Sequence, residues 1–312
     1  MTRTLTEARS AGLLGNPENQ SHSSTTAASG GDADLNATTT QVLERISVAA
    51  PYFAFTDLER DEDGWVRASV PTAIPSSPER GAMIADQIAR HLAILGSCAA
   101  ALDLDGEARH HYLATRAEYE RLGEVPTEPI RDGLWARATA RWHDKRTASA
   151  ETELCSGDGT VLNRLRVDYA VLKPRMFERF NPPVEGDPLA PADVLSVIEP
   201  GRVVRDCGGV DEAMCRGHFP GHPAAPVALL MGRLVATTAD AMQSRLGSSV
   251  DYLVESGMVA ATGLAQAGQH LVLHGQYESD EGDGLHLLSG DAQADGETVG
   301  EVSVVLRAME RG

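Results

Sequence analysis

The sequence carries the same order of predicted elements twice, and this repeat constrains the fold more than any other feature. An apolar, alanine-rich helix is predicted over residues 81–102, where Met83, Ile88 and Leu95 recur at helical spacing. A second such helix is predicted over residues 227–246. Several strand-like segments follow each helix, so each half reads as one long buried helix with antiparallel strands. We therefore expect an α+β protein built from a diverged internal duplication.

Turn signals divide the strand-like segments that follow each helix. The clearest is Ser156–Gly159, and Glu281–Gly284 and Asp295–Gly296 mark similar hairpins in the second half. No glycine-rich phosphate loop and no strand–helix–strand alternation occurs, which argues against a nucleotide-binding α/β fold. The predicted strands cover residues 64–70, 134–143, 147–155, 161–169, 258–264, 271–277, 285–292 and 299–307.

Composition shifts along the 312 residues predict the domain organisation. The segment 21–32 is small and polar, and such a segment cannot bury enough surface to offset its ordering entropy. We predict a disordered tail over residues 1–45. The segment 181–188 is rich in proline and glycine, so we place the domain boundary there. The two predicted units span residues 46–185 and 186–312.

Charge and cysteine content exclude several classes of protein. The chain has 45 acidic and 27 basic residues, a formal net charge of -18, which disfavours binding to nucleic acid and to anionic membranes. Four cysteines in a chain of this length do not make a disulfide scaffold. No apolar run has the length of a membrane helix, and the sequence starts without a signal-peptide pattern. We expect a cytoplasmic protein.

The segment Arg216–Pro226, with the sequence RGHFPGHPAAP, carries the strongest chemical signal. It is a tight loop of glycine and proline that delivers His218 to the start of the second predicted helix. Unpaired N–H groups at a helix N-terminus can bind a carbonyl oxygen that gains negative charge. A histidine on such a loop can act as a general base near neutral pH.

The pattern Gly-His-Phe-Pro-Gly-His-Pro-x-x-Pro before a buried helix resembles the active-site loop of the bacterial β-hydroxyacyl-[acyl carrier protein] dehydratases. The resemblance implies the hotdog fold, a long helix wrapped by an antiparallel sheet, and here a double hotdog of two tandem units. In that family two hotdogs pair, and each site takes a histidine from one unit and an acid from the helix of the other. The acid lies fourteen positions after the histidine in its own chain.

Each half of this sequence has one part of that family site. Fourteen residues after His218 stands Gly232, which is not an acid. Aligning the first helix, with Gly81 at the family's helix-starting glycine, brings Asp86 to the acid position. The segment 70–78 before that helix contains no histidine. The resemblance therefore implies one composite site that combines His218 with Asp86.

The resemblance implies dehydration of a (3R)-hydroxyacyl thioester to the trans-2-enoyl thioester, in fatty-acid or polyketide biosynthesis. His218 would remove the proton alpha to the thioester, and Asp86 would hold and protonate the leaving hydroxyl. No metal and no organic cofactor is expected, because the thioester already acidifies the proton alpha to it. The resemblance also implies that the substrate is carried on the phosphopantetheine of an acyl carrier protein. The predicted oxyanion and substrate-binding residues are Gly221, Val227, Pro226, Phe219 and Arg90; the family has glycine at the position of Val227.

Other interpretations of the same residues stay open. His218 and His222 could cap the helix, and Asp86 could pair with Arg90 one helical turn on. A zinc site made of Cys207, Cys215 and the two histidines has the wrong spacing for common zinc knuckles. The alternative functions are a hotdog thioesterase or acyltransferase acting on the same thioester, and a non-catalytic acyl-binding or scaffold protein.

An acidic carrier protein would need a local basic patch on this acidic chain. The densest group of basic residues is Lys173, Arg175, Arg179, Arg164 and Arg166, which could equally be solvated surface charges. We expect either a monomeric pseudo-dimer or a homodimer. The sequence assigns no role to His91 or Arg233, and it predicts that His110 and His111 are exposed.

Overall fold

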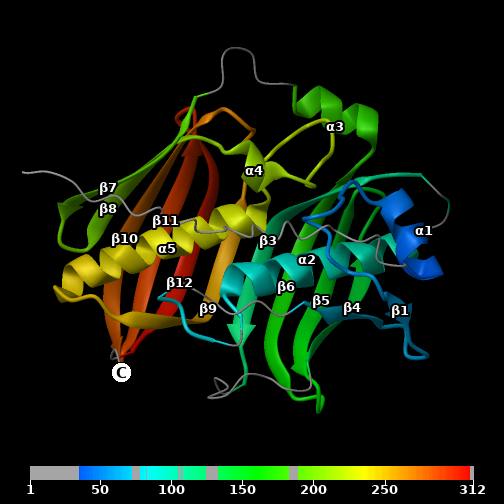
Figure 1. Cartoon of the computed structure of the whole chain (residues 1–312), viewed down its shortest axis with the longest axis horizontal. Coiled ribbons are helices and arrows are strands. Elements are labelled where there is room, and N and C mark those ends of the chain that lie inside the picture. Colours follow the sequence, from blue (N-terminus) through cyan, green and yellow to red (C-terminus); the bar gives the residue numbers. More distant parts are fainter. Residues whose placement is uncertain are drawn as a thin grey trace, which may run out of the picture. The chain divides into compact units, whose positions relative to one another are not determined.

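Two long helices form close to the predicted places and cover one face of a large sheet (Figure 1). The computed structural model describes residues 35–71, 78–81, 83–104, 106, 108–123, 133–182 and 189–309. Helix α5 (Val227–Leu246) has the predicted bounds and ends at Gly247, whose φ of 67° gives the left-handed C-cap. Helix α2 (Ala85–Leu102) begins four residues later than predicted, because Gly81 has a φ of 145° and is not helical.

Within the described residues, twelve strands form one antiparallel sheet with the order β1-β2-β4-β5-β6-β3-β9-β12-β11-β10-β8-β7. Helix α2 packs on β4 and β5, α5 packs on β10 and β11, and the two helices contact each other. The strands are β1 (Glu59–Arg60), β2 (Val66–Val70), β3 (His111–Arg121), β4 (Leu134–Trp142), β5 (Thr147–Ser156), β6 (Val161–Leu172), β7 (Pro191–Glu199), β8 (Arg202–Gly209), β9 (Asp251–Ala261), β10 (His270–Gly282), β11 (Leu285–Ala294) and β12 (Glu297–Met309).

The strand order of the first half is repeated in reverse by the second half. Reading outward from the centre, the first half runs β3-β6-β5-β4-β2-β1 and the second runs β9-β12-β11-β10-β8-β7. The halves meet where β3 pairs with β9, with Ala117 opposite Val259. Each half places its long helix at the same point of this order, after two strands. The topology therefore has the internal repeat that the sequence indicates.

The eight predicted strands all exist, and four further strands were not predicted. Strands β5 and β6 are joined at the predicted turn 156–159, and β11 and β12 at Asp295–Gly296. Strand β3 cannot be recognised from alternating apolar residues, because its second part consists of charged and partly exposed residues. Strand β7 lies at the sheet edge and is exposed on both faces, so it has no alternation of apolar and polar residues.

Each long helix has its own hydrophobic core. Leu92, Leu95 and Cys98 of α2 lie in one cluster, and Leu234 and Met242 of α5 lie in the other. All five side chains have no solvent exposure, as expected for helices that are apolar on the face turned to the sheet.

Three short helices complete the described structure: α1 (Ala37–Arg45), α3 (Pro174–Phe180) and α4 (Glu212–Cys215). Helix α1 lies inside the segment predicted as a disordered tail, and it is ordered by the Asn36 cap and by buried Val42. The rest of that tail, up to residue 34, and the boundary at residues 185/186 lie outside the described residues. No helix in the described part of the chain is long and apolar enough to cross a bilayer.

Candidate active site

The loop that carries His218 connects α4 to α5 and is held by the first half of the chain. The Phe219 N–H donates to the Ser47 carbonyl over 3.2 Å, and the Ala49 N–H donates to the Gly217 carbonyl over 2.8 Å. A Cβ atom at Gly217 would collide with the Ala49 carbonyl, and its φ of 80° also favours glycine. The loop of the second half is thus anchored on backbone of the first half.

His218 is buried in a defined tautomer. Its Nδ1 lies 2.9 Å from the Ala224 carbonyl oxygen, and because a carbonyl only accepts, Nδ1 carries the proton. Nε2 of the neutral ring therefore has a free lone pair. Burial lowers the pKa of His218 to about 4, with a smaller lowering by His111, against the raising effect of the bond to Ala224. The ring is neutral at pH 7, as a general base must be.

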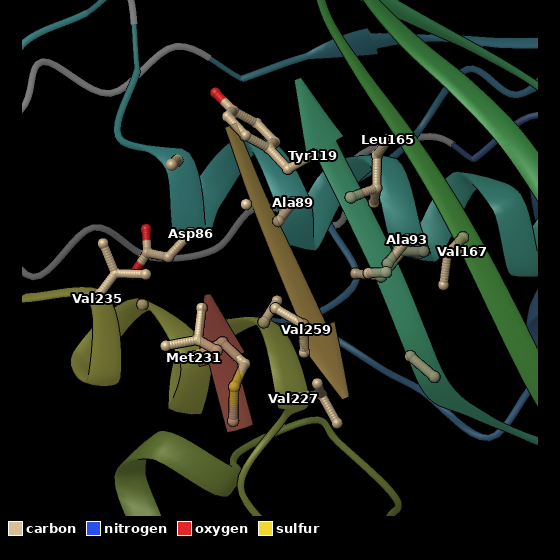
Figure 2. A pocket seen from close by; sticks show the side chains of 18 of the residues that line it. Asp86, Ala89, Ala93, Tyr119, Leu165, Val167, Val227, Met231, Val235 and Val259 are labelled. Carbon is tan, nitrogen blue, oxygen red and sulfur yellow. The ribbon is translucent and has the colours of Figure 1, made fainter. Parts of the chain in front are cut away.

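Asp86 lies in the first turn of α2 and faces α5. Figure 2 shows it beside Val235, and a Cβ atom at Gly232 would collide with its side chain. Its Oδ1 atom is buried and has no hydrogen-bond partner among the described residues. Burial raises the pKa of Asp86, while contacts with Gln87 and the charge of Arg90 lower it. Among the described ion pairs none joins Asp86 to Arg90, so the pairing considered from the sequence is not found.

One cavity brings His218 and Asp86 together between the two halves. Its walls are mainly apolar side chains of α2, α5, β3, β6, β9 and β12 (Figure 2). The side chains with charge or proton-transfer capacity on this wall are those of Glu79, Asp86, Arg233 and His218, with Tyr52, Tyr112, Tyr119, Tyr169 and Tyr252. An apolar cavity with few polar groups suits a ligand that has a long apolar part and one reactive group.

The first turn of α5 lies at this cavity and contains N–H groups without intrahelical acceptors. The first N–H groups of any helix have no intrahelical acceptor. In α5 the N-cap residue is Pro226, whose side chain cannot accept from them either. Val227 and Ala228, in the first turn, both line the cavity. Of the predicted oxyanion and substrate residues, Phe219 and Val227 line the cavity, whereas Gly221 and Pro226 do not.

Arg90 does not line the cavity either, but it lies behind the residues that do. Its guanidinium carbon is 5.9 Å from the centre of the Tyr52 ring, and that ring contacts the His218 ring edge-on at 5.0 Å. Its Nη2 lies 3.1 Å from Nε2 of His91. Arg90 therefore supports the cavity wall through Tyr52.

Three further histidines, His110, His111 and His222, lie around the loop. His110 and His111, predicted as exposed, are buried, and the His111 ring stacks on Phe177 at 3.9 Å. His222 packs edge-on against the same Phe177 ring. Within the described ranges, no group of three or more His, Cys, Asp or Glu side chains could hold a metal ion.

Sequence reasoning missed Glu79 and Tyr52, which both line the cavity. Glu79 precedes α2, and its Oε1 accepts the Ala85 N–H over 2.6 Å; it thus satisfies the first N–H of that helix, whose N-cap residue Ile84 makes no side-chain cap bond. An acidic residue near the start of an apolar helix is favourable and can be recognised in a sequence. The predicted helix start at Gly81, four residues too early, gave no reason to connect Glu79 with Ala85. Tyr52 carries no comparable signal, because its place beside His218 depends on a contact between distant segments.

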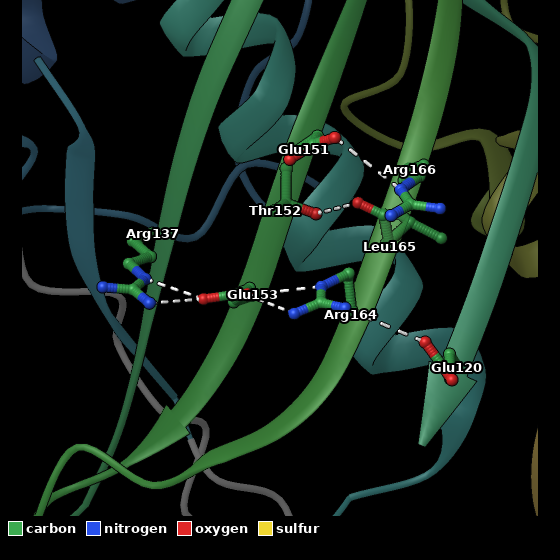
Figure 3. Close-up of polar contacts among 8 residues, drawn as sticks. All are labelled: Glu120, Arg137, Glu151, Thr152, Glu153, Arg164, Leu165 and Arg166. Carbon is green, nitrogen blue, oxygen red and sulfur yellow. Dashed lines mark hydrogen bonds and ion pairs between the residues drawn. The ribbon is translucent and has the colours of Figure 1, made fainter. Parts of the chain in front are cut away.

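The predicted basic patch splits into two parts. Arg164 and Arg166 lie on β6 in ion pairs with Glu153 and Glu151, at 3.0 and 3.7 Å, as Figure 3 shows. These two arginines are therefore already neutralised within the sheet. Lys173, Arg175 and Arg179, at the cap and on the surface of α3, are exposed and belong to no ion pair among the described residues.

Comparison with solved structures supports the fold. No protein-family model and no curated protein matches the sequence. The tesB protein of Mycobacterium avium subs paratuberculosis matches with a TM-score of 0.55 and 15% identity, over 81% of this chain and 96% of that one. The 12:0-ACP thioesterase from Umbellularia californica matches with a TM-score of 0.52 and 11% identity, over 84% and 100%.

A third similar structure is described as having the hotdog fold. A conserved protein of unknown function with a hot dog fold, from Alicyclobacillus acidocaldarius, matches with a TM-score of 0.50 and 13% identity, over 85% of this chain and 100% of that one. At these identities the likeness establishes the hotdog fold and nothing finer. The dehydratases that the His218 loop resembles are not what these comparisons point to.

Proposed function

We propose that this protein is a hotdog-fold enzyme that hydrolyses an acyl thioester in the cavity between α2 and α5. The observation that carries the proposal is the cavity itself, which is apolar along its walls and contains the Asp86 carboxylate and the uncapped start of α5. A structural neighbour that is a thioesterase for an acyl-carrier substrate favours hydrolysis over other reactions of the same thioester.

In this proposal the thioester carbonyl oxygen accepts hydrogen bonds from the Val227 and Ala228 N–H groups. A water molecule held between Asp86 and Nε2 of His218 attacks the carbonyl carbon, and Asp86 takes its proton. The carbon–sulfur bond then breaks, and the thiolate leaves with the proton from Asp86. The raised pKa of Asp86 makes its carboxylate a stronger base for the first step and a better proton donor to sulfur for the second.

Dehydration of a (3R)-hydroxyacyl thioester is the second candidate function, and the His218 tautomer favours it. A base with its lone pair on Nε2 and a separate carboxyl group on the opposite half suit proton removal at one carbon and hydroxyl loss at the next. In that reaction Nε2 takes the α-proton, the carbon–oxygen bond breaks, and Asp86 donates the proton that completes the leaving water.

The proposal extends to the architecture and the partner. We infer that the two halves form a double hotdog with a single composite site, because only the second half has the histidine and only the first has the acid. We infer also that the acyl group is presented on the phosphopantetheine of an acyl carrier protein. Lys173, Arg175 and Arg179 would contact this acidic partner, since Phe177 of the same helix packs on Phe219 beside His218.

Mass spectrometry of two acyl-carrier substrates of equal chain length, one saturated and one 3-hydroxylated, separates these functions. Hydrolysis releases free acid and unloaded carrier from both substrates. Dehydration leaves the 3-hydroxyacyl carrier lighter by one water and the saturated one unchanged. Asp86→Asn and His218→Gln should abolish the reaction, whereas Asp103→Asn at the other end of α2 should not. If neither substrate changes, the enzymatic proposal is wrong.

A further inference from the structure

A group of aromatic rings packs around His218, apart from the two cores. The Phe219 ring stacks on the His218 ring with the ring centres 3.9 Å apart, and the Phe177 ring meets Phe219 edge-on at 4.9 Å. Both phenylalanines are buried, yet within the described residues neither belongs to the core of α2 or to that of α5. The two rings therefore form a separate cluster on the loop that carries His218.

Phe219 has a backbone conformation that depends on its surroundings. Its φ is 51°, in the left-handed region that bulky residues rarely adopt. Such a residue persists only where the surrounding structure fixes it, and residues of this kind concentrate at functional sites. Two hydrogen bonds fix the backbone: the Phe219 N–H donates to the Ser47 carbonyl over 3.2 Å, and the Phe219 carbonyl accepts the His222 N–H over 2.9 Å. The ring needs a support of its own, because neither bond acts on the side chain.

Phe177, on α3 of the first half, provides that support. Its ring stacks on the His111 ring at 3.9 Å with an angle of 4° between the planes, and it meets the His222 ring edge-on at 5.5 Å. His111 in turn contacts Phe219 edge-on at 5.2 Å. Phe177 is the one buried residue of α3 and has no solvent exposure. The Phe177 ring is thus fixed, and it limits the positions that the Phe219 ring can take.

Phe219 determines the tilt of the His218 ring. Nδ1 of that ring lies 2.9 Å from the Ala224 carbonyl oxygen, and Tyr52 meets the ring edge-on at 5.0 Å. A hydrogen bond at one atom still lets a ring tilt about that atom, whereas the Phe219 ring against its face, at 29° between the planes, opposes the tilt. The tilt sets the direction of Nε2, the atom that we propose to act on the substrate.

We propose that Phe177 is a positioning residue for His218: it holds the Phe219 ring in place, and the stacked Phe219 ring directs Nε2. The inference rests on the proposed function of His218. Phe219 lines the cavity and Phe177 does not, so Phe177 acts on the reaction through Phe219. Displacement of a reacting group by about 1 Å can cost roughly 100-fold in rate. Helix α3 then has a buried residue that governs kcat, besides the exposed cations that we propose for carrier binding.

Steady-state kinetics of Phe177→Leu with an acyl-carrier substrate test this role. The kcat should fall by about 10–100-fold, with KM within about twofold of the wild type, because substrate binding is kept and orientation is lost. Phe180→Leu, exposed on the same helix, should keep the wild-type kcat. So should Leu273→Val, which loosens the second core away from the cavity wall. An unchanged kcat in Phe177→Leu, or an equal fall in Leu273→Val, would overturn the inference.

A double-mutant cycle tests whether Phe177 acts through Phe219. Phe219→Leu removes the ring that stacks on His218, so in that background Phe177→Leu should lower kcat no further. Losses that multiply in the double variant would contradict the proposed route. If Phe177→Leu does not fold, Phe177→Met takes its place in the cycle, with the same expected result.

Proton NMR of the His218 ring needs no activity and separates failure of this inference from failure of the proposed function. The stacked Phe219 ring should shift the His218 ring-proton resonances to high field, and their absence from His218→Gln identifies them. Phe177→Leu should return them toward ordinary histidine positions, and Phe180→Leu should not. Unmoved resonances in Phe177→Leu would refute the positioning role even in an active enzyme. Moved resonances in a protein without activity would support that role and reject only the proposed function.

Discussion

Three buried histidines stay neutral in the folded protein, and this couples its stability to pH. Burial lowers the pKa values of His91, His111 and His218 to about 4 each. In the unfolded chain a histidine has a pKa of about 6.5. The unfolded state therefore binds more protons than the folded state between these values. The contribution is fully present above pH 6.5 and is lost as the pH falls through 4.

We predict that His218→Gln loses less stability on acidification than the wild type. Between pH 7 and pH 5 the free energy of unfolding of the wild type should fall by roughly 1–2 kcal/mol more than that of the variant. Urea unfolding curves at the two pH values measure this difference. The same substitution at exposed His143 should leave the wild-type difference unchanged. An equal fall in His218→Gln and wild type would show that His218 is not held neutral.

Single residues also show how far the sequence could lead to the site. His218 and Asp86 lie on one cavity, as expected from a short motif and a helical register. Their roles remain predictions. Tyr52 and Glu79 cannot be found from the sequence, because Tyr52 contacts His218 from a distant segment and Glu79 accepts the first N–H of a helix that begins four residues after its predicted start. Local patterns locate residues along the chain, whereas these contacts depend on tertiary packing.

The contact between α2 and α5 depends on the pairing of a large and a small residue. The sequence resemblance aligns Asp86 with Gly232, and the glycine leaves the space that the Asp86 side chain fills. An acid at both positions would place two carboxylates in contact. The helices and most strands follow from apolar periodicity and turns, but the edge strands β1 and β7 are exposed throughout and carry no such pattern.

Gly232→Ala should therefore destabilise the protein and reduce kcat together. The added methyl group meets the Asp86 side chain, and such overpacking costs about 1–3 kcal/mol. A double-mutant cycle with Asp86→Gly isolates the contact: in that background Gly232→Ala should cost much less, because the side chain it would meet is gone. Thermal and urea unfolding of the four proteins provide the values. Additive costs would contradict the contact.

At the scale of the whole molecule, the proposed composite site means one reactive site per chain and not two. The matching position for the acid in the second half is Gly232, and the matching helix start in the first half is capped by Glu79. Asp86→Asn should therefore remove essentially all activity, by about 10²–10⁴-fold, rather than half of it. Active-site titration with a non-hydrolysable acyl thioester analogue should give one site per chain. Half-activity or two sites would contradict a composite site.

With a net charge of -18, the protein as a whole repels an acidic carrier protein. Association would therefore depend on a local group of cations, for which we propose Lys173, Arg175 and Arg179 of α3. Reversing Lys173, Arg175 and Arg179 to Glu changes the net charge by -6, to -24, and should raise KM for the acyl-carrier substrate about tenfold with kcat unchanged. The acyl-pantetheine thioester, which has no carrier protein, should react as with the wild type. Reversal of the exposed Arg116, Arg146 and Arg202 gives the same net charge on other elements. If this control raises KM as much, general repulsion and not α3 governs docking.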